Sequence, residues 1–372
     1  MDLIIQITGA AIVLVAAIDL FLTILYARSG TGLLSPLLNR ATWRLFRGAA
    51  RLSRRRKDNI LSYCGPSLIV VLLVFWVGFF IVGFALIIWP RLGVDVTASS
   101  GPTPTGFLNA VYYSGYSFST LGTGNLVPRT ELFRMIMVLQ SVLGFSFFTL
   151  VITYFLSVFS SLHRRNILAL TLHYKTLGTA DPSEYICRLG SEPDSAQIRS
   201  QFTTLSAGLT DLLESHHFYP ILHFFRFRET YYGLPRIILI AMDSISLVRS
   251  ALDGDEYAWL IDSSATGELW HSGTTLLPYL SESFLPRRYV PRFYDESENE
   301  APRWRTHYFS TLEKLRKRGI ATPKDPEKGF ETYLALRRQW YPYVLAFCEY
   351  MQFDPKRVVT FPGIEDSPDP GD

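Results

Sequence analysis

Between two long apolar runs lies a short segment whose residues could coordinate a dehydrated cation: Thr120-Leu121-Gly122-Thr123-Gly124-Asn125. A cation that has shed its water must be surrounded by oxygen atoms, and rings of backbone carbonyls can supply them. Consecutive carbonyls point at one axis when alternate residues take positive φ, which glycine does at little steric cost. Gly122 and Gly124 have that spacing, and Thr120 adds a carbonyl and a hydroxyl at the inner end.

This segment resembles the pore loop of the tetrameric potassium channel family, whose usual filter is Thr-Val-Gly-Tyr-Gly-Asp. Tyr112 and Tyr113 stand where that family has an aromatic pair on its pore helix, and Leu126-Val127-Pro128 matches the stretch after the filter. Gly144 lies 24 residues after Thr120, where many members have a hinge glycine in the inner helix. The resemblance covers about residues 60–163.

Two filter residues depart from the family pattern. Thr123 replaces an aromatic residue that braces the filter against the pore helix, and we expect its short side chain not to reach that helix. Asn125 replaces an aspartate and removes a charge at the outer mouth. A weakly selective monovalent cation channel is therefore the alternative to a potassium channel. An ordinary glycine turn between membrane helices is a further alternative, but the spacing, the flanking runs and Pro128 favour the filter.

Three runs exceed the roughly 20 apolar residues needed to cross a bilayer. They are Leu3–Tyr26, Leu68–Trp89 and Leu132–Leu162. The first lacks the basic start and the cleavage site of a signal peptide, so we interpret it as a retained span. Asp19 is its one charged residue, and intramembrane acids often mark function. For Asp19 we favour a hydrogen bond to a neighbouring helix or an interaction with the basic segment that follows.

The charge of the loops predicts the orientation. Residues 28–57 contain nine basic side chains and no acidic one: Arg28, Arg40, Arg44, Arg47, Arg51, Arg54, Arg55, Arg56 and Lys57. The positive-inside rule places this segment in the cytoplasm. The N-terminus and the filter loop then lie outside, and the residues after His163 lie in the cytoplasm. We expect a multi-pass protein of the plasma membrane, or of the inner membrane if the source is bacterial.

The basic segment is predicted to form a helix on the membrane surface. Its arginines recur at helical spacing, at Arg40, Arg44, Arg47 and Arg51. Apolar surface is supplied by Leu38, Ala41, Leu45 and Leu52. Such a helix suits an anionic inner leaflet, so we expect Arg44, Arg47 and Arg51 to bind anionic lipid. A voltage-sensing helix is the alternative, but the segment lacks a long apolar background.

A filter needs a pore helix before it. Thr105 is the expected N-cap of a pore helix over about 106–118. The resemblance implies that Tyr112, Tyr113 and Tyr116 support the filter from behind. Generic aromatic packing at a helix interface is compatible with that role.

The inner helix is expected over Leu132–Leu162, a length of on the order of 45 Å. Gly144, Phe148, Ile152 and Leu156 share one stripe with Phe159. By resemblance this stripe lines the inner cavity, with Gly144 as the hinge. Several copies of Ile152 or Leu156 would form a hydrophobic constriction that gates by dewetting. Packing against lipid or another helix is the alternative for the stripe.

We expect an all-α membrane protein in which a two-helix pore-loop channel domain has an extra N-terminal transmembrane helix and a mainly helical cytosolic domain. The boundaries are 1–27 for the first helix, 28–59 for the basic segment, 60–163 for the pore domain, 164–361 for the cytosolic domain and 362–372 for a disordered tail. One filter loop cannot surround an ion, so closure needs a symmetric homo-oligomer. The resemblance implies a homotetramer.

The cytosolic part contains no motif that identifies its ligand. We expect helices at Ala196–His216, Pro235–Leu252, Arg303–Arg318 and Lys328–Gln352. Neither a dinucleotide-binding glycine motif nor a nucleophile–base arrangement occurs, so we expect no enzyme activity and no cofactor beyond K+ as the permeant ion. A metal site is the weaker interpretation of two polar clusters: His216, His217, His223 and Glu214, and Asp253, Asp255 and Glu256.

The net charge and the cysteines limit the expected partners and the redox state of the thiols. The net charge of +3 gives no reason to expect nucleic acid as a partner, and the three cysteines are expected to be reduced thiols. A membrane-anchored sensor or effector, whose pore unit serves only to form a tetramer, is the alternative of a different class.

Overall fold

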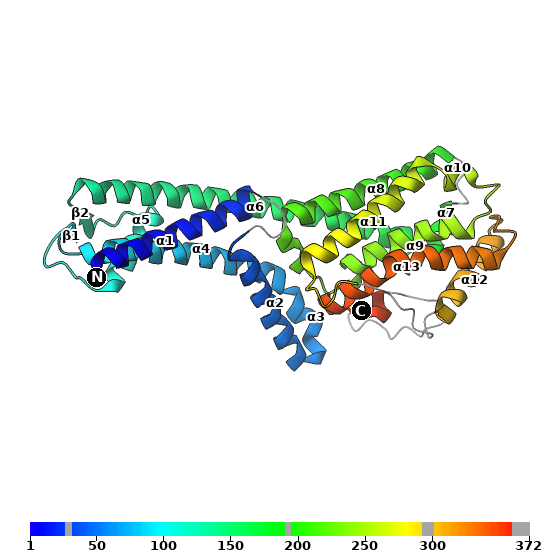
Figure 1. Ribbon diagram of the computed structural model, residues 1–372, viewed down its shortest axis with the longest axis horizontal. Helices are drawn as coiled ribbons and strands as arrows, with labels where there is room; N and C mark the ends of the chain where they lie inside the picture. Colours follow the sequence, from blue (N-terminus) through cyan, green and yellow to red (C-terminus); the bar gives the residue numbers. More distant parts are fainter. Residues whose placement is uncertain (27–31, 190–194, 292–300, 359–372) are drawn as a thin grey trace. The chain divides into compact units, whose positions relative to one another are not determined.

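The computed structural model describes residues 1–26, 32–189, 195–291 and 301–358. The start of the predicted basic segment, 28–31, and the predicted tail, 362–372, lie outside these residues. The chain divides into two compact units, Met1–Ser160 with Phe218–Phe225 and Ser161–His217 with Arg226–Asp372. Both are built from helices (Figure 1), which confirms the predicted all-α membrane fold.

The first unit contains the membrane helices. Its elements are α1 (Asp2–Leu20) with a π-helical turn (Phe21–Leu25), α2 (Ser35–Leu52), α3 (Lys57–Ser62), α4 (Cys64–Ile88), β1 (Val96–Ala98), α5 (Phe107–Phe118), β2 (Leu126–Pro128) and the start of α6 (Glu131–Lys175). Among the described residues, three stretches are long and apolar enough to cross a membrane: Asp2–Leu25, Lys57–Arg91 and Glu131–Lys175. They contain the three predicted runs, except that the first ends at Leu25 and not at Tyr26.

Several predicted boundaries were wrong. The N-cap of α5 is Gly106, with no side-chain capping bond, so Thr105 does not have that role. Between α4 and α5 lies β1, which pairs antiparallel with β2 in the register Val96↔Pro128. The inner helix does not end at Leu162 but continues to Lys175. These strands and the extra turns depend on contacts across the chain, which local sequence patterns do not show.

Small residues bring α1 and α4 together. A Cβ atom added to Gly9 would lie 2.5 Å from the carbonyl oxygen of Gly83, so the two backbones are in direct contact. The Gln6 side chain donates a hydrogen bond of 3.1 Å to the carbonyl of Ile87. Glycine allows this close approach between membrane helices. The N-terminal helix is therefore packed tightly on the outer helix of the pore region.

The fully buried Asp19 connects three helices. Its carboxylate accepts hydrogen bonds from the backbone N–H of Leu34 at 2.7 Å, the hydroxyl of Ser35 at 2.6 Å and the indole N–H of Trp76 at 2.9 Å. Asp19 belongs to α1, Trp76 to α4, and Leu34 and Ser35 begin α2. The predicted hydrogen bond to a neighbouring helix is confirmed, and it fixes the start of α2.

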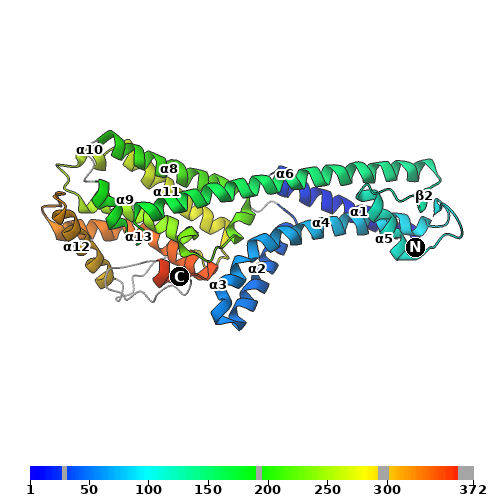
Figure 2. The ribbon, with the colours of Figure 1, turned by 180° about the vertical axis from the view of Figure 1, so that it is seen from behind.

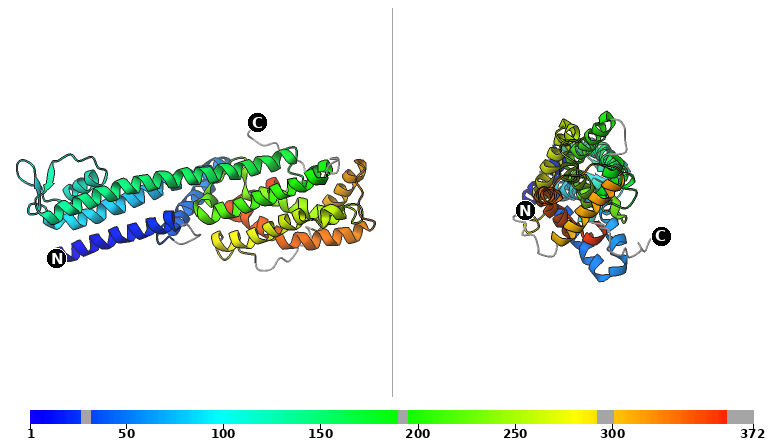
Figure 3. Two further views of the ribbon diagram at one scale, coloured as in Figure 1. Left: turned by 90° about the horizontal axis from the view of Figure 1, so that it is seen from above. Right: turned by 90° about the vertical axis from the view of Figure 1, so that its right-hand side faces the viewer.

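The second unit begins within α6 and is also helical. Its further elements are α7 (Pro182–Leu189), α8 (Ser195–Phe218), α9 (Leu234–Ala251), α10 (Ala258–Ile261), α11 (Ser264–Phe284), α12 (Ala301–Lys317), α13 (Pro326–Met351) and α14 (Pro355–Val358). The four predicted helices are present as α8, α9, α12 and α13, whereas α7 and α11 were not predicted. Figures 2 and 3 show α9, α11 and α13 packed together, with α9 almost entirely buried.

A buried polar network lies in the core of this unit. The Asp243 carboxylate accepts hydrogen bonds from the Tyr333 hydroxyl at 2.8 Å and from Arg337, and lies 3.2 Å from Nε2 of His307. The Arg337 guanidinium carbon is 3.2 Å from the centre of the Trp304 ring. Burial alone would raise the pKa of Asp243, but the charge of Arg337 and the bond to His307 hold it below its ordinary value. The network joins α9, α12 and α13.

Candidate ion-conduction site

The filter segment follows the C-terminal end of α5 and has an alternating backbone. Thr120, Gly122 and Gly124 have φ values of +59°, +60° and +73°. The sequence predicted positive φ at the two glycines, and the structure extends the alternation to Thr120. For a residue other than glycine, a positive φ of this size costs roughly 1–2 kcal/mol. The surrounding contacts must therefore hold Thr120 in this conformation.

The amides of the segment point back toward α5. Leu121 donates its N–H to the carbonyl of Tyr116 at 2.9 Å, and Thr120 donates to Ser117 at 3.2 Å. No described residue donates a hydrogen bond to the carbonyls of Thr120, Leu121, Gly122, Thr123 or Gly124. All five residues are exposed in the single chain. The segment thus presents consecutive carbonyl oxygens that are available to a ligand such as a cation.

Tyr112 links the filter segment to α5. Its hydroxyl donates a hydrogen bond of 3.2 Å to Oγ1 of Thr123 and accepts one of 3.2 Å from Nδ2 of Asn125. The expectation that Thr123 cannot reach the pore helix was therefore wrong. The long side chain of Tyr112 spans the distance from α5 to the filter segment, so the short side chain of Thr123 can still be bonded to the pore helix. Both residues that depart from the family pattern share this one hydroxyl.

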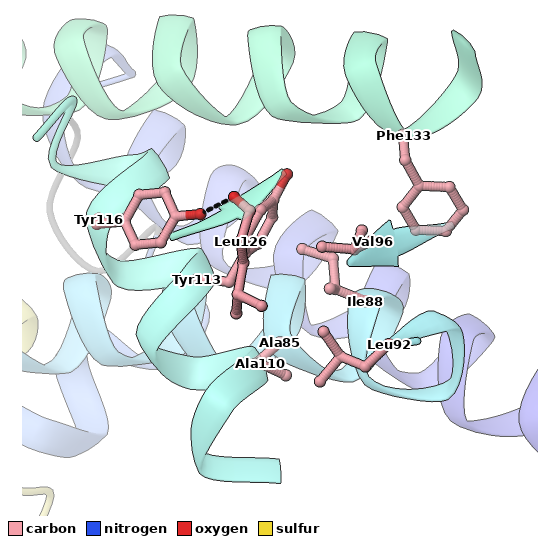
Figure 4. Packing of buried hydrophobic residues seen from close by; sticks show 9 residues of the cluster. All are labelled: Ala85, Ile88, Leu92, Val96, Ala110, Tyr113, Tyr116, Leu126 and Phe133. Carbon is pink, nitrogen blue, oxygen red and sulfur yellow. Dashed lines mark hydrogen bonds between the residues drawn. The ribbon is translucent and has the colours of Figure 1, made fainter. Parts of the chain in front are cut away.

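Tyr113 and Tyr116 are buried behind the segment (Figure 4). The Tyr116 hydroxyl donates a hydrogen bond to the carbonyl of Leu126, the second residue after Gly124. The rings of the two tyrosines pack edge to face at 5.3 Å, in a cluster with Ala85, Ile88, Leu92, Val96, Ala110, Leu126 and Phe133. The outer end of the filter segment is thus anchored to α4, α5 and α6.

The inner helix α6 contacts the C-terminal end of α5 through residues that the sequence analysis missed. Gln140 is buried and donates a hydrogen bond of 2.8 Å to the carbonyl of Ser114, and Ser141 donates one of 3.1 Å to Ser117. Gln140 and Ser141 are a polar pair in an otherwise apolar helix, one turn before Gly144, and this pattern could have indicated that they bond a neighbouring helix. Gly144 faces the same helix end, and α6 is unbroken there, so this glycine is a contact point, and its role as a hinge stays a prediction.

The predicted cavity stripe is exposed in the single chain. Phe148, Ile152, Leu156 and Phe159 are 39%, 59%, 67% and 49% exposed. The Phe148 ring lies 6.1 Å from that of Phe118 at the end of α5, so the stripe begins beside the filter segment. An apolar stripe of this size is typical of a surface covered by another chain or by lipid.

The remaining predicted residues belong to other elements. Arg44, Arg47 and Arg51 are on α2. The three cysteines, Cys64, Cys187 and Cys348, are buried thiols.

The histidines considered as metal ligands make other contacts. Nδ1 of His216 lies 2.8 Å from the carbonyl oxygen of Leu212, and the ring of His217 stacks on Tyr279. Burial and the nearby charge of Arg165 lower the pKa of His216 to about 3. Within the described ranges, no three His, Cys, Asp or Glu residues are grouped to hold a metal ion.

Known proteins share sequence similarity with parts of this chain. Residues 68–161, from α4 through the filter segment to α6, match the family model described as an ion channel. The uncharacterized membrane protein YdjJ of Bacillus subtilis (strain 168) is 27% identical over 236 residues, which cover 63% of this chain and 66% of the relative. The chain thus spans just under two thirds of that relative's length. No solved structure matches the chain.

Proposed function

We propose that the protein conducts K+ passively across the membrane as a homotetramer, with the filter carbonyls of Thr120–Gly124 facing the ion. The observation that carries this proposal is the alternation of positive φ over Thr120, Gly122 and Gly124, together with the absence of described hydrogen-bond donors to the five carbonyls. A connecting loop has no need for this arrangement. A sensor that used the pore unit only to form a tetramer would not need it either.

Fourfold assembly is supported by the exposed surfaces of the single chain. One chain presents one row of carbonyls, and a K+ ion needs oxygens on all sides. The exposed apolar stripe of α6 would line the cavity below the filter, where four copies of Ile152 and Leu156 form the gate. Symmetric closure would turn both the row of carbonyls and the apolar stripe toward one axis.

Selectivity for K+ over Na+ is supported by the contacts of Thr123. Its bond to Tyr112 ties the filter to the pore helix, so the lack of a filter aromatic does not leave the filter unsupported. Asn125 donates to the same hydroxyl and limits movement of the outer mouth. These contacts favour a potassium channel over the weakly selective alternative.

Gating is proposed to involve α6 and the second unit. The helix continues without a break from Ile152 to Lys175, beyond the residue at which the second unit begins. A ligand or partner that binds one conformation of the second unit better would bias the gate by that difference in affinity. We further propose that the N-terminus lies outside and the second unit in the cytoplasm of a bacterial inner membrane or a plasma membrane.

Recording from purified full-length protein in planar bilayers, with K+ on one side and Na+ on the other, tests this function. We expect single-channel currents whose reversal potential lies near that of K+. A reversal potential near zero would favour the weakly selective channel. Silence of protein that assembles as a tetramer under every condition would favour the sensor alternative.

A further inference from the structure

Helix α2 has three distinct faces. Taking about 100° per residue, its buried side chains Trp43 and Ala50 fall on one side, toward the rest of the first unit. Trp43 packs against Phe224 with ring centres 6.0 Å apart. Leu37, Leu45 and Leu52 lie within about 80° on another side. They are 62%, 73% and 92% exposed.

Arginines occupy the third face, next to the leucines. Arg40, Arg44 and Arg51 fall within about 40° of one another and adjoin Leu37. All three are exposed, and none forms an ion pair with another described residue. Arg47, which we expected to bind anionic lipid with Arg44 and Arg51, is half-buried. An exposed apolar face bordered by a row of cations is unfavourable in water, but it matches hydrocarbon beneath a layer of anionic headgroups.

The start of α2 is held at the end of a membrane span. Asp19, which lies in the last turns of α1, accepts hydrogen bonds from Leu34 and Ser35 at the beginning of α2. The same carboxylate is bound to Trp76 in the middle of α4. Because Asp19 lies in the last turns of the candidate span Asp2–Leu25, α2 begins near that end of the span. Figure 1 shows α2 turning away from α1 and α4 at this point.

We propose that α2 is a membrane-surface helix that binds an anionic lipid leaflet. The leucine face enters the headgroup boundary, and Arg40, Arg44 and Arg51 bind lipid phosphates. This inference does not depend on which ion the protein conducts. Each arginine near an anionic surface favours the inserted state by roughly fivefold before screening by salt.

Depth-dependent fluorescence quenching tests this proposal. Full-length Leu45→Cys protein is labelled with a small fluorophore and placed in vesicles of phosphatidylcholine alone or mixed with anionic phosphatidylglycerol. Both vesicles contain lipid with a nitroxide high on its acyl chain. Since the native cysteines are buried, protein without the introduced cysteine measures background labelling. We expect stronger quenching in the anionic vesicles, and a loss of the difference in 1 M salt, where the screening length is about 3 Å.

Two matched charge variants identify the source of the binding. The combined Arg40→Gln, Arg44→Gln and Arg51→Gln variant should reduce quenching in anionic vesicles to the neutral level. Arg188→Gln, Arg228→Gln and Arg287→Gln remove the same charge from exposed positions of the second unit and should have no effect.

Two results would overturn the proposal. One is quenching that is equal in neutral and anionic vesicles. The other is an absence of quenching in the labelled protein, combined with a disulfide between Leu45→Cys residues of two subunits in the unlabelled protein, because the leucine face would then be a contact between copies. The salt titration uses the three arginines unchanged, so it keeps the test valid if the triple variant misfolds.

Discussion

A Cβ atom on Gly144 would lie 1.8 Å from the carbonyl oxygen of Phe118, so the inner helix α6 touches the backbone of α5 where the filter segment begins. Gln140 and Ser141 donate hydrogen bonds to the same end of α5. The filter is therefore supported by the helix that is proposed to carry the gate. This contact gives Gly144 a packing role in addition to the proposed hinge.

Replacing Gly144 with alanine should displace α5 from α6. Overpacking of a close contact typically costs about 1–3 kcal/mol, and here the obstacle is backbone that cannot rotate away. We expect lower thermal stability of the assembled protein and loss of current. Gly78→Ala is the matched control, because no atom lies within 4 Å of the added Cβ at that position in α4. Normal currents from Gly144→Ala would contradict the close contact.

Gly122→Ala and Gly124→Ala should each abolish conduction while the protein still assembles. A Cβ at these positions meets no atom within 4 Å in the chain, so its effect comes from φ values of +60° and +73°. An L-residue there is strained by roughly 1–2 kcal/mol and turns a carbonyl away from the ion path. D-alanine favours positive φ and should preserve the current if introduced by semisynthesis. Equal effects of L- and D-alanine would show that conformation is not the cause.

Tyr112→Phe should reduce the preference for K+. The substitution removes one hydroxyl that bonds both Thr123 and Asn125, and a hydrogen bond contributes about 1 kcal/mol, or roughly fivefold in a permeability ratio. The shift in reversal potential between K+ and Na+ measures the change. Tyr113→Phe makes the same chemical change one residue away, where the hydroxyl does not bond the filter, and should leave the ratio unaltered. Identical ratios for Tyr112→Phe and the unmodified protein would show that this hydroxyl does not support selectivity.

Asp243→Asn should destabilise the second unit by about 3–5 kcal/mol, because Arg337 would keep its charge in the core without a counter-ion. Thermal unfolding of the full-length protein measures the loss. Asp255→Asn breaks the exposed pair with Lys324 and should have little effect. Similar losses from the two substitutions would show that burial of the pair is not decisive.

The same network predicts acid sensitivity. The pKa of Asp243 is lowered in the folded protein from its ordinary value of 3.8. The stabilisation by its ionised form is thus complete well above pH 3.8 and is lost as the pH falls through the lowered folded value. Asp243→Asn should flatten this part of the stability curve. If the stability of the variant falls at low pH as steeply as that of the unmodified protein, the prediction is contradicted.

The filter backbone could be predicted from the sequence because its requirement is local. Positive φ at alternate positions calls for glycine, and Gly122 and Gly124 provide it within three residues. The partner of Thr123 could not be predicted in this way. It is supplied by Tyr112, which is 11 residues earlier and reaches Thr123 only because α5 is placed beside the segment.

Contacts that depend on how the helices pack also could not be predicted from the sequence. Asp19 was recognised as a hydrogen-bonding residue, but its partners on α2 and α4 come from distant parts of the chain. Likewise, nothing local to Phe218–Phe225 indicated that this short stretch packs with the first unit. Gly144 was noticed for its family position, whereas its contact with Phe118 follows from the packing of α6 on α5.

The most direct test of the central proposal is to locate the ion. Anomalous diffraction from crystals of the full-length protein grown with Tl+, which substitutes for K+ and scatters strongly, would show where monovalent cations bind. The proposal predicts peaks in a row on a fourfold axis, between the carbonyl oxygens of Thr120, Leu121, Gly122 and Thr123 from four chains. A tetramer without Tl+ peaks beside these carbonyls, or an assembly in which they face away from its axis, would contradict it.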